Sequence, residues 1–386
     1  METENKKKHP DNDSRYAKRI GLCFVAIIVV FLIAGILVPD SSFSDVENRS
    51  LQLFPKLSLR EYSNGRLEKK LENYVNDQFV CRNLFIKLKS AIDVSAGSVY
   101  SNGVWKGKDG YLIEDVVVPE DKRLDKAVKA IDKFKSEHKS IPMRFMLVPT
   151  AANIYSDKLP SLSYTADQNK YMDEFFSRLE KIDVEGIDVR LEFSSAADDV
   201  QLYYRTDHHW TMDGAKLAAD EFVKNRKLPE KEFELYEVKN DFVGSLAAKS
   251  GFTGGKADAI KLAVAKDGLN SAIYYDDTQK KTSKYYKMSN LNKRDAYTVY
   301  GGKNHPLYTI KTPTSSNRRL LLIKDSYANS MIPFLTQYYR EIVVVDPRYY
   351  YDDINVTMLT ENVNEVLFLY NANTFFEDDA VAMMLE

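Results

Sequence analysis

The sequence predicts an α/β protein with a mostly parallel sheet flanked by helices, and three observations lead to that fold class. Short apolar runs of strand length alternate with helical patterns. The run Phe145–Val148 is apolar throughout and ends at Pro149, as a strand buried on both faces would. A chain of 386 residues, 44% of them apolar, is long enough to bury a full core. Strands joined through helices imply right-handed crossovers and parallel pairing.

One long apolar segment precedes this fold. Residues 20–38 read IGLCFVAIIVVFLIAGILV and carry no charge. At ~1.5 Å per residue they span ~28 Å, close to the ~30 Å hydrocarbon core of a membrane. The basic residues before this segment are Lys6, Lys7, Lys8, Arg15, Lys18 and Arg19.

By the positive-inside rule, residues 1–19 form a cytoplasmic tail and the chain after Val38 is exported. A cleaved signal peptide is the alternative. However, the apolar run is longer than the usual ~7–15 residues of such peptides, and no A-x-A-like cleavage site follows it. We therefore expect a single-pass anchor in the lipid bilayer of the cell membrane, with an extracytoplasmic working domain.

The exported part divides into a linker and a domain. Residues 39–100 are expected to form a juxtamembrane and helical linker, because the apolar spacing from Leu67 to Ile92 suits an amphipathic helix. Residues 101–386 carry the α/β rhythm, interrupted at about 229–315 by an insertion or cap rich in turns and short strands. The strands are expected at 145–148, 187–191, 320–323, 342–345 and 366–369. The helices are expected at 124–138, 168–181, 213–224, 329–338 and 354–362.

Charge and cysteine content exclude several classes of protein. The formal net charge is −2 and no long basic block follows the first 20 residues, so no nucleic-acid partner is expected. The two cysteines, Cys23 and Cys81, form no disulfide framework and have no CxxC partner. The exported domain must therefore rely on its core for stability.

Ligands of open α/β sheets bind beyond the carboxyl ends of the strands, which directs attention to a few short segments. The segment 203–211, Tyr-Tyr-Arg-Thr-Asp-His-His-Trp-Thr, follows the expected strand near Leu191. The segment 324–329, Lys-Asp-Ser-Tyr-Ala-Asn, follows another strand directly and opens a helix. Candidate chemistry is expected just after Val148, Leu191, Ile323, Val345 and Leu369.

Three side chains in these two segments form a complete catalytic set. In extended chain, residues i and i+2 face the same way, so Asp207 and His209 share a side while His208 points away. A carboxylate beside an imidazole holds its tautomer and stabilises the imidazolium. Ser326 sits at a strand-to-helix turn, where its hydroxyl is exposed and helix amides lie near a developing negative charge. The set supplies nucleophile, base and orienting group, and no cofactor is expected.

Two other interpretations stay open. An Asp-Ser pair before a helix is commonly a helix cap. Asp207, His208 and His209 could also bind a metal. The remaining exported histidines, His138 and His305, lie elsewhere in the sequence, and neither cysteine is near, so a metal site would be short of ligands.

The run RTDHHWTMDGA around these histidines resembles the signature of the DHHW family, which is similar to the exported O-acetylation proteins of bacterial alginate synthesis. Those proteins are SGNH hydrolase-like, with an Asp-x-His pair before the serine in sequence. The resemblance therefore implies an SGNH hydrolase-like sheet. Further similar segments are Glu47–Leu51, Gln78–Arg82, Gly107–Leu112, Pro149–Tyr155, Lys324–Ser330 and Val345–Tyr349.

Carried onto this sequence, the resemblance implies Ser326 as nucleophile, His209 as general base and Asp207 as its orienting group. It implies no catalytic role for His208. Arg348 falls where a cation would meet a substrate carboxylate or acyl oxygen, although a structural ion pair is an equal alternative. Gly244 and Asn304 are the candidates for oxyanion donors. Lys324 stands where the related sequences have glycine.

The resemblance implies a serine O-acyltransferase, or an acetylesterase of the same mechanism, acting on a cell-surface or exported polysaccharide. It also implies a multi-span membrane O-acyltransferase as the partner that supplies the acyl group. Two alternatives remain: a non-catalytic glycan-binding or scaffold protein of an acetylation complex, and a metal-dependent hydrolase.

Overall fold

The computed structural model of the chain describes residues 10–41, 43–44, 49–55, 57, 62, 66–252, 255–268 and 270–386. The described chain forms two compact units, Met1–Lys89 and Ser90–Glu386. Half of the basic residues before the apolar segment, namely Lys6, Lys7 and Lys8, lie outside the described residues, as do Glu47 and Asn48. The predicted limits of tail, anchor, linker and domain stay predictions.

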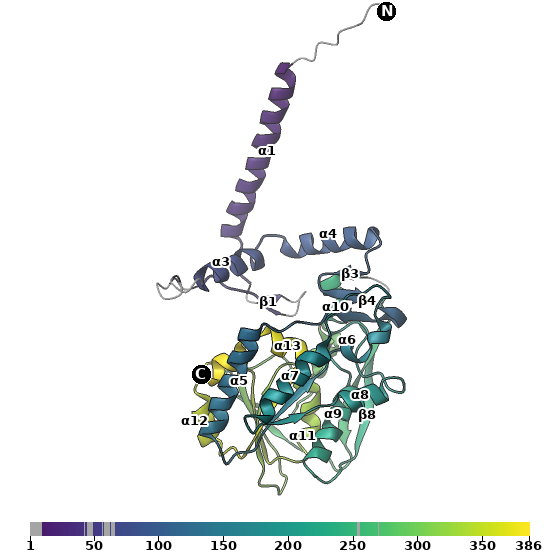
Figure 1. Ribbon diagram of the computed structural model, residues 1–386, viewed down its shortest axis with the longest axis vertical. Helices are drawn as coiled ribbons and strands as arrows, with labels where there is room; N and C mark the ends of the chain where they lie inside the picture. The colour runs from purple at the N-terminus through teal and green to yellow at the C-terminus, as the bar shows by residue number, and fades with distance from the viewer. Residues whose placement is uncertain are drawn as a thin grey trace, which may run out of the picture. The chain divides into compact units, whose positions relative to one another are not determined.

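The first unit begins with a long helix, α1, drawn in purple in Figure 1. Its segment Arg15–Leu37 is long and apolar enough to cross a membrane. The predicted amphipathic stretch after it is two helices rather than one, because the chain breaks at Cys81, whose φ is 60°. The elements of this unit are α1 (Pro10–Leu37), β1 (Phe43–Ser44), β2 (Arg49–Ser50), α3 (Arg66–Asp77) and the first part of α4 (Arg82–Ser95).

The second unit is built on an eight-stranded sheet in the order β11-β10-β12-β14-β13-β15-β6-β7. The five strands from β14 to β7 are parallel, while β12, β10 and β11 continue the sheet antiparallel. The mostly parallel α/β fold predicted from the sequence is thereby confirmed. The strands are β6 (Met143–Val148), β7 (Glu185–Ile187), β10 (Ala272–Tyr275), β11 (Lys280–Thr282), β12 (Leu307–Lys311), β13 (Arg319–Lys324), β14 (Glu341–Val345) and β15 (Glu365–Asn371).

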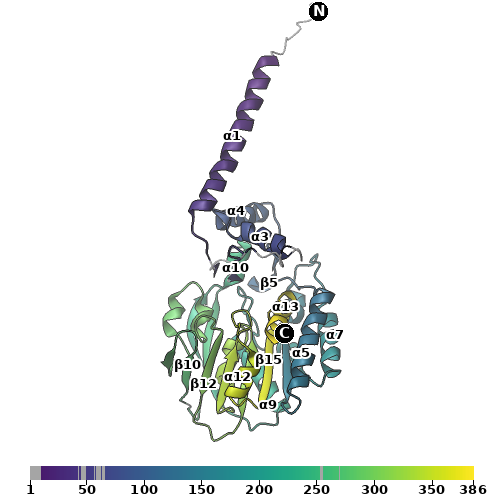
Figure 2. The ribbon, with the colours of Figure 1, turned by 90° about the vertical axis from the view of Figure 1, so that its left-hand side faces the viewer.

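Helices cover both faces of this sheet. Along β13, Leu321 and Ile323 pack with α5, α7 and α12 to α14, whereas Leu320 and Leu322 pack with α8, α9 and α11. This alternation follows from the period of two in a strand. In Figure 2, α5 and α7 lie at the opposite end of the fold from β10 and β12. The helices are α5 (Asp121–Glu137), α6 (Ala151–Ile154), α7 (Gln168–Glu180), α8 (Arg190–Ala196), α9 (Met212–Asn225), α10 (Ser245–Ser250), α11 (Ala328–Leu335), α12 (Ile354–Thr360), α13 (Ala372–Glu377) and α14 (Ala380–Leu385).

The predicted insertion at 229–315 contributes to the core as well as to the surface. Its strands β10, β11 and β12 extend the main sheet, and β12 pairs along the whole of β14. This pairing covers an edge that would otherwise expose unpaired backbone groups. Its first part forms a separate ribbon of β8 (Phe233–Phe242) and β9 (Asp258–Ala265). A three-stranded sheet of β3 (Tyr100–Ser101), β4 (Val104–Lys106) and β5 (Leu112–Glu114) precedes the core.

One predicted strand, 187–191, is wrong over most of its length. The strand β7 ends at Ile187, and Asp188 accepts a hydrogen bond from the amide of Arg190 at 3.0 Å. This aspartate turn ends the strand and starts α8. Leu191 is accordingly 74% exposed. The segment 203–211 therefore follows a helix and an irregular connection, not a strand.

Candidate active site

The first half of the site is the histidine loop, Arg205–Thr211. The amide of Tyr204 donates to the carbonyl of His209 at 3.2 Å, and the amide of Thr211 donates to that of Leu202 at 2.8 Å. These bonds hold the loop in a non-helical, hairpin-like form. Thr211 then caps α9 by accepting the Gly214 amide at 3.2 Å. The loop is thus fixed at both ends, and Asp207 and His209 share a side as its spacing predicts.

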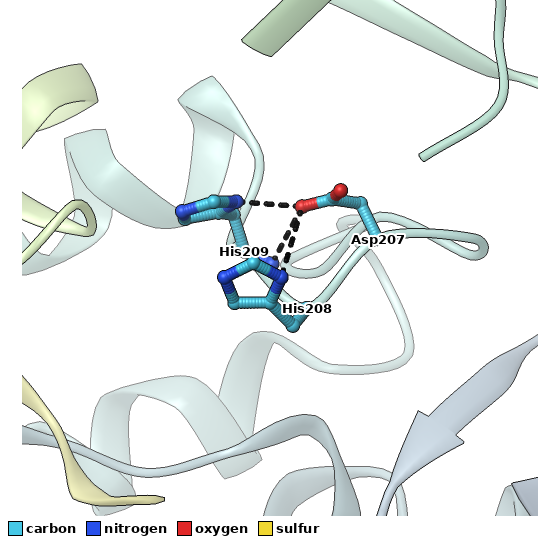
Figure 3. Close-up of side chains that lie close together, drawn as sticks. All are labelled: Asp207, His208 and His209. Atoms are coloured by element: carbon cyan, nitrogen blue, oxygen red, sulfur yellow. Dashed lines mark hydrogen bonds and ion pairs between the residues drawn. The ribbon is translucent and has the colours of Figure 1, made fainter. Parts of the chain in front are cut away.

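A continuous chain of hydrogen bonds joins Ser326, His209 and Asp207. The Oγ of Ser326 lies 2.8 Å from Nε2 of His209, and Nδ1 of His209 lies 2.6 Å from Oδ1 of Asp207. Figure 3 shows the His209 ring turned toward this carboxylate. Asp207 also accepts the amides of His209 at 3.0 Å and Ser245 at 2.8 Å. The structure therefore brings together the three side chains singled out in the sequence, from positions 117 residues apart.

The second half of the site is the serine turn, Lys324–Tyr327, between β13 and α11. Between Leu320 and Ile332, Ser326 is the only residue that is not buried. Asp325 is fully buried, and its carboxylate accepts the amides of Tyr327 and Asn371, each at 2.9 Å. Burial raises the pKa of Asp325 above its usual value. The Asp-Ser pair therefore does form a local turn, but this turn leaves the serine hydroxyl at the edge of the sheet where the parallel strands end.

Lys324 occupies its position without disturbing this turn. None of Lys324, Asp325 and Ser326 has a positive φ, so the backbone there does not require glycine. The buried ammonium of Lys324 lies 3.5 Å from Oδ2 of Asp346 and donates to Oδ1 of Asn304 at 3.5 Å. Arg348 forms a bidentate ion pair with Asp346 at 2.9 and 2.7 Å. Arg348 and Asn304 therefore belong to a charged cluster beside the turn, and any contact with substrate stays a prediction.

Gly244 lies behind Asp207 rather than in front of Ser326. Its amide donates to Oγ1 of Thr206 at 2.9 Å. A Cβ at this position would stand 2.3 Å from the Cβ of Asp207, closer than two carbon atoms can approach without a bond. The glycine thus lets the next amide, that of Ser245, reach the carboxylate. Because the amide of Gly244 already donates to Thr206, this hydrogen bond does not support the predicted role of Gly244 as an oxyanion donor, and that role stays a prediction.

Aromatic side chains tie the two halves together. The indole of Trp210 donates to the carbonyl of Tyr327 at 2.9 Å and to Ser330 at 2.7 Å. The hydroxyl of Tyr327 donates back to the carbonyl of His208. Trp210 is fully buried. The last residue of the DHHW run therefore links the histidine loop to the start of α11.

Tyr297 is a site residue that the sequence did not indicate. It comes from the short helix η4 (Ala296–Val299) within the inserted region, and its ring stacks on His209 with centroids 3.6 Å apart and planes inclined by 9°. Its hydroxyl donates to the carbonyl of Ser326 at 3.2 Å. One residue thus contacts both catalytic candidates.

The charges of the site favour a neutral imidazole beside an ionised carboxylate. Burial lowers the pKa of His209 to about 4, and His208 adds to this, although Asp207 and Glu114 act in the opposite direction. Burial alone would raise the pKa of Asp207, but His209, His208 and the accepted hydrogen bonds hold it well below its usual value. At neutral pH His209 is therefore free to accept a proton.

His208 lies at the edge of this site, and the prediction that it points away from Asp207 and His209 is wrong, because residues 205–209 form bends and not an extended strand. Its ring is 3.9 Å from that of His209, and Nδ1 lies 2.8 Å from Oγ of Ser245 and 3.7 Å from Oδ1 of Asp207. Ligand atoms of Asp207, His208 and His209 all lie within 4.8 Å of one another, and Figure 3 shows the three side chains close together. However, two ligands on one zinc ion stand about 3.3 Å apart at ~2.0 Å bond lengths. The 2.6 Å between Asp207 and His209 is instead a hydrogen-bond distance.

Asn371 is a second residue that the sequence reasoning did not name. It ends β15, whose pairing with β13 runs as far as Lys324 and Leu369, two residues before Ser326 and Asn371. The side-chain Nδ2 of Asn371 is buried and has no hydrogen-bond partner among the described residues. The amide of Ser326 likewise has none among them. The expectation that chemistry lies beyond the carboxyl ends of the strands did include the region just after Leu369. An amide side chain in that region was the signal in the sequence that could have identified Asn371.

Comparison with known proteins adds to this geometry. A family model described as "SGNH hydrolase-like domain, acetyltransferase AlgX" matches residues 104–281, a range that includes Asp207 and His209 and ends before Ser326. The resemblance inferred from the sequence is confirmed. The chain is 26% identical over 168 residues to the probable alginate O-acetylase AlgJ of Pseudomonas fluorescens, covering 42% of this chain and 43% of that protein. To the AlgJ of Pseudomonas syringae pv. tomato it is 24% identical over 201 residues, covering 50% and 51%.

The chain thus spans about half the length of these curated relatives. Among solved structures, it resembles a DHHW family protein from Eubacterium siraeum with a TM-score of 0.63 and 23% identity, covering 74% of this chain and 96% of that one. It also resembles Bacillus cereus PatB1, solved with a sulfonyl adduct, with a TM-score of 0.59 and 21% identity over 71% and 96% of the chains. These two similarities show the overall fold of the second unit, and the family model describes that fold as SGNH hydrolase-like.

Proposed function

We propose that this protein is a membrane-anchored, extracytoplasmic serine O-acyltransferase, or an acetylesterase of the same mechanism, acting on a cell-surface or exported polysaccharide. The observation that carries the proposal is the hydrogen-bonded chain from Ser326 through His209 to Asp207. The matches to acetyltransferase and alginate O-acetylase sequences supply the reaction class.

The first half of the reaction transfers an acyl group to the enzyme. His209 takes the hydroxyl proton of Ser326 on Nε2 while Oγ attacks the acyl carbonyl carbon of the donor. The resulting imidazolium is stabilised by the carboxylate of Asp207. The tetrahedral intermediate then collapses, the leaving group takes the proton from His209, and Ser326 carries the acyl ester. The low pKa of His209 suits it to begin this step in its neutral form.

The negative oxygen of the intermediate needs donors that are free before it forms. We assign this part to the amide of Ser326 and to Nδ2 of Asn371, both without a partner among the described residues. In the second half of the reaction His209 takes the proton of a sugar hydroxyl, whose oxygen attacks the acyl carbonyl carbon. The intermediate then breaks the bond to Ser326, and His209 returns the proton to Oγ as it leaves. Water in place of the sugar gives hydrolysis.

The location of the protein follows from α1. We propose that this helix spans the membrane with its N-terminus in the cytoplasm, because basic residues precede it and none follows it for eleven residues. The domain then lies outside the cytoplasm, away from the cytoplasmic pool of activated acyl groups. We therefore propose a multi-span membrane O-acyltransferase as the partner that supplies the acyl group.

The test is turnover of p-nitrophenyl acetate by the purified full-length protein and three single variants. Ser326→Ala and His209→Ala are expected to reduce turnover by at least ~10³-fold, because each removes an essential member of the set. His208→Ala is the matched control. Its turnover at neutral pH is expected to stay within about tenfold of the wild-type value, because His208 takes no part in the proton transfers. Equal losses in both histidine variants, together with inactivation by a chelator, would favour a metal-dependent hydrolase. No turnover by the wild-type protein, with a cellular phenotype that Ser326→Ala leaves intact, would favour a non-catalytic glycan-binding or scaffold protein.

A further inference from the structure

We propose that an apolar patch on α3 and the first part of α4 lies in the surface of the same membrane that α1 spans, so that lipid holds the first unit at two places. This inference rests on the proposed anchor, and it concerns a surface that takes no part in the proposed chemistry. The patch consists of Val75, Phe79, Leu84, Phe85 and Leu88.

The patch is unusually apolar for a surface facing water. The exposed fraction is 60% for Val75, 44% for Phe79, 63% for Leu84, 45% for Phe85 and 54% for Leu88. On α4 the side chain at 88 is a neighbour of those at 84 and 85, because residues three and four apart lie side by side on a helix surface. A contiguous apolar surface of this kind marks a binding site for another apolar phase.

Contacts with α1 set the depth of the patch. The ring of Phe31 stacks on that of Phe79 with centroids 5.4 Å apart, and it lies 6.0 Å from the ring of Phe85. Phe31 is six residues before the end of α1 at Leu37, which is about 9 Å along the helix axis. A spanning α1 therefore places Phe79 and Phe85 beside the outer part of the hydrocarbon layer, where lipid rather than a soluble protein is available as occupant.

Hydrogen bonds fix α3 to the exit of α1. Gln78, just after α3, accepts the amide of Ser41 at 3.0 Å and donates to its carbonyl at 2.9 Å. The hydroxyl of Tyr74 donates to Asp40 at 3.1 Å. These bonds join the end of α3 to Asp40 and Ser41, the third and fourth residues after α1, so the patch cannot move away from the membrane without breaking them.

The charges beside the patch suit lipid headgroups. Between Arg82 and Lys89 the sequence carries three cations, Arg82, Lys87 and Lys89, and no acidic residue. An amphipathic helix with basic side chains beside an apolar face is the form that lies in a membrane interface and is attracted to anionic lipid. Depth, fixation and charge all favour the bilayer surface as the occupant of this patch.

The test uses the full-length chain in vesicles of phosphatidylcholine and phosphatidylglycerol. The native thiols are removed as Cys23→Ser and Cys81→Asn, since asparagine tolerates the positive φ at 81. A single cysteine is then placed by Leu88→Cys in the patch, by Ile28→Cys in the span, or by Leu359→Cys on α12, an exposed leucine of the second unit. Each is labelled with an environment-sensitive dye, and nitroxide lipids serve as quenchers, with the nitroxide near the top of the acyl chain for Leu88→Cys, near its end for Ile28→Cys, and at both depths for Leu359→Cys.

The labels at Leu88→Cys and Ile28→Cys are expected to lose most of their emission to the nitroxide, and the label at Leu359→Cys to keep it. Adding Leu84→Glu and Phe85→Glu is expected to abolish quenching at Leu88→Cys while leaving that at Ile28→Cys. Quenching at Ile28→Cys but not at Leu88→Cys would overturn the proposed membrane contact of the patch and leave the proposed anchor in place. Quenching at neither position would overturn both proposals. The turnover of p-nitrophenyl acetate tests the proposed chemistry separately. Quenching at Leu88→Cys that survives the two glutamates also overturns the proposal.

Discussion

The histidine loop and the serine turn meet in one site, yet different kinds of interaction hold them in place. The serine turn follows a central strand, and a buried carboxylate, that of Asp325, fastens it to the neighbouring strand. The histidine loop belongs to no strand of the eight-stranded sheet; its Arg205 carbonyl accepts the amide of Leu112 in β5. The loop also depends on side chains and amides from the inserted region, notably Ser245 and Tyr297. We conclude that the core sheet positions the nucleophile and that the insertion positions the base.

The largest expected effect tests this difference directly. Asp207→Asn removes the charge that stabilises the imidazolium and is expected to lower kcat by about 10⁴-fold. The measurements are p-nitrophenyl acetate kinetics and thermal unfolding. The matched variant in the serine turn, Asp325→Asn, loses part of a buried clamp and, like Asp207→Asn, is expected to cost about 1–3 kcal/mol of unfolding free energy, since each carboxylate accepts two backbone amides. A loss under tenfold in Asp207→Asn would contradict the assigned roles.

The next effect concerns the strand beside the serine turn. Asn371→Ala removes the proposed oxyanion donor and is expected to reduce kcat by about 10²–10³-fold, with KM nearly unchanged. The control is Asn373→Ala, because Asn373 hydrogen-bonds the backbone of Val117 and Asp115 and has a structural part. That variant is expected to lower the unfolding temperature instead. If kcat of Asn371→Ala stays within about threefold of the wild type, another group stabilises the oxyanion.

A third variant breaks the link between the two halves. Trp210→Phe removes the indole donor to Tyr327 and Ser330 and is expected to cost about 1–3 kcal/mol in urea unfolding. The chain offers a matched control in its other tryptophan: the indole nitrogen of Trp105 has no hydrogen-bond partner among the described residues. Trp105→Phe is therefore expected to cost clearly less. Equal losses in the two variants would mean that bulk, and not the hydrogen bonds, makes Trp210 important.

The same contrast explains what the sequence could predict. Ser326 and the Asp207–His209 pair were found because local rules, a strand end and a spacing of two, govern where such side chains point. Tyr297, Asn371 and the position of Gly244 depend on contacts between distant segments, which no local pattern records. Similarly, β10 and β11 have four and three residues, too short to show a period, and their pairing with a distant strand alone reveals them as part of the sheet.

The smallest expected effect examines the electrostatic part of the histidine loop. The activity should fall as pH drops through about 4, where His209 takes a proton and ceases to be a base. His208→Gln removes a neighbour that lowers this pKa and is expected to move the acid limb of kcat/KM to higher pH, toward the usual 6.5, with activity at pH 7 within about threefold. The pH profile of ester turnover measures the shift.

A control variant and the pH dependence of stability separate the effect of His208 from that of other charged groups near His209. Burial, together with the charge of Asp207, raises the pKa of Asp295 to about 6, so Asp295→Asn serves as the control and is expected to leave the limb near 4. Stability follows the same sign: the pKa of His209 is lower folded than unfolded, so its contribution is complete above about pH 6.5 and is lost as pH falls toward 4. In His208→Gln the pKa of His209 in the folded protein rises. The pH range over which its contribution to stability is lost therefore becomes narrower, because the lower limit of that range moves up. An unmoved limb in His208→Gln would mean that burial alone sets the basicity of His209.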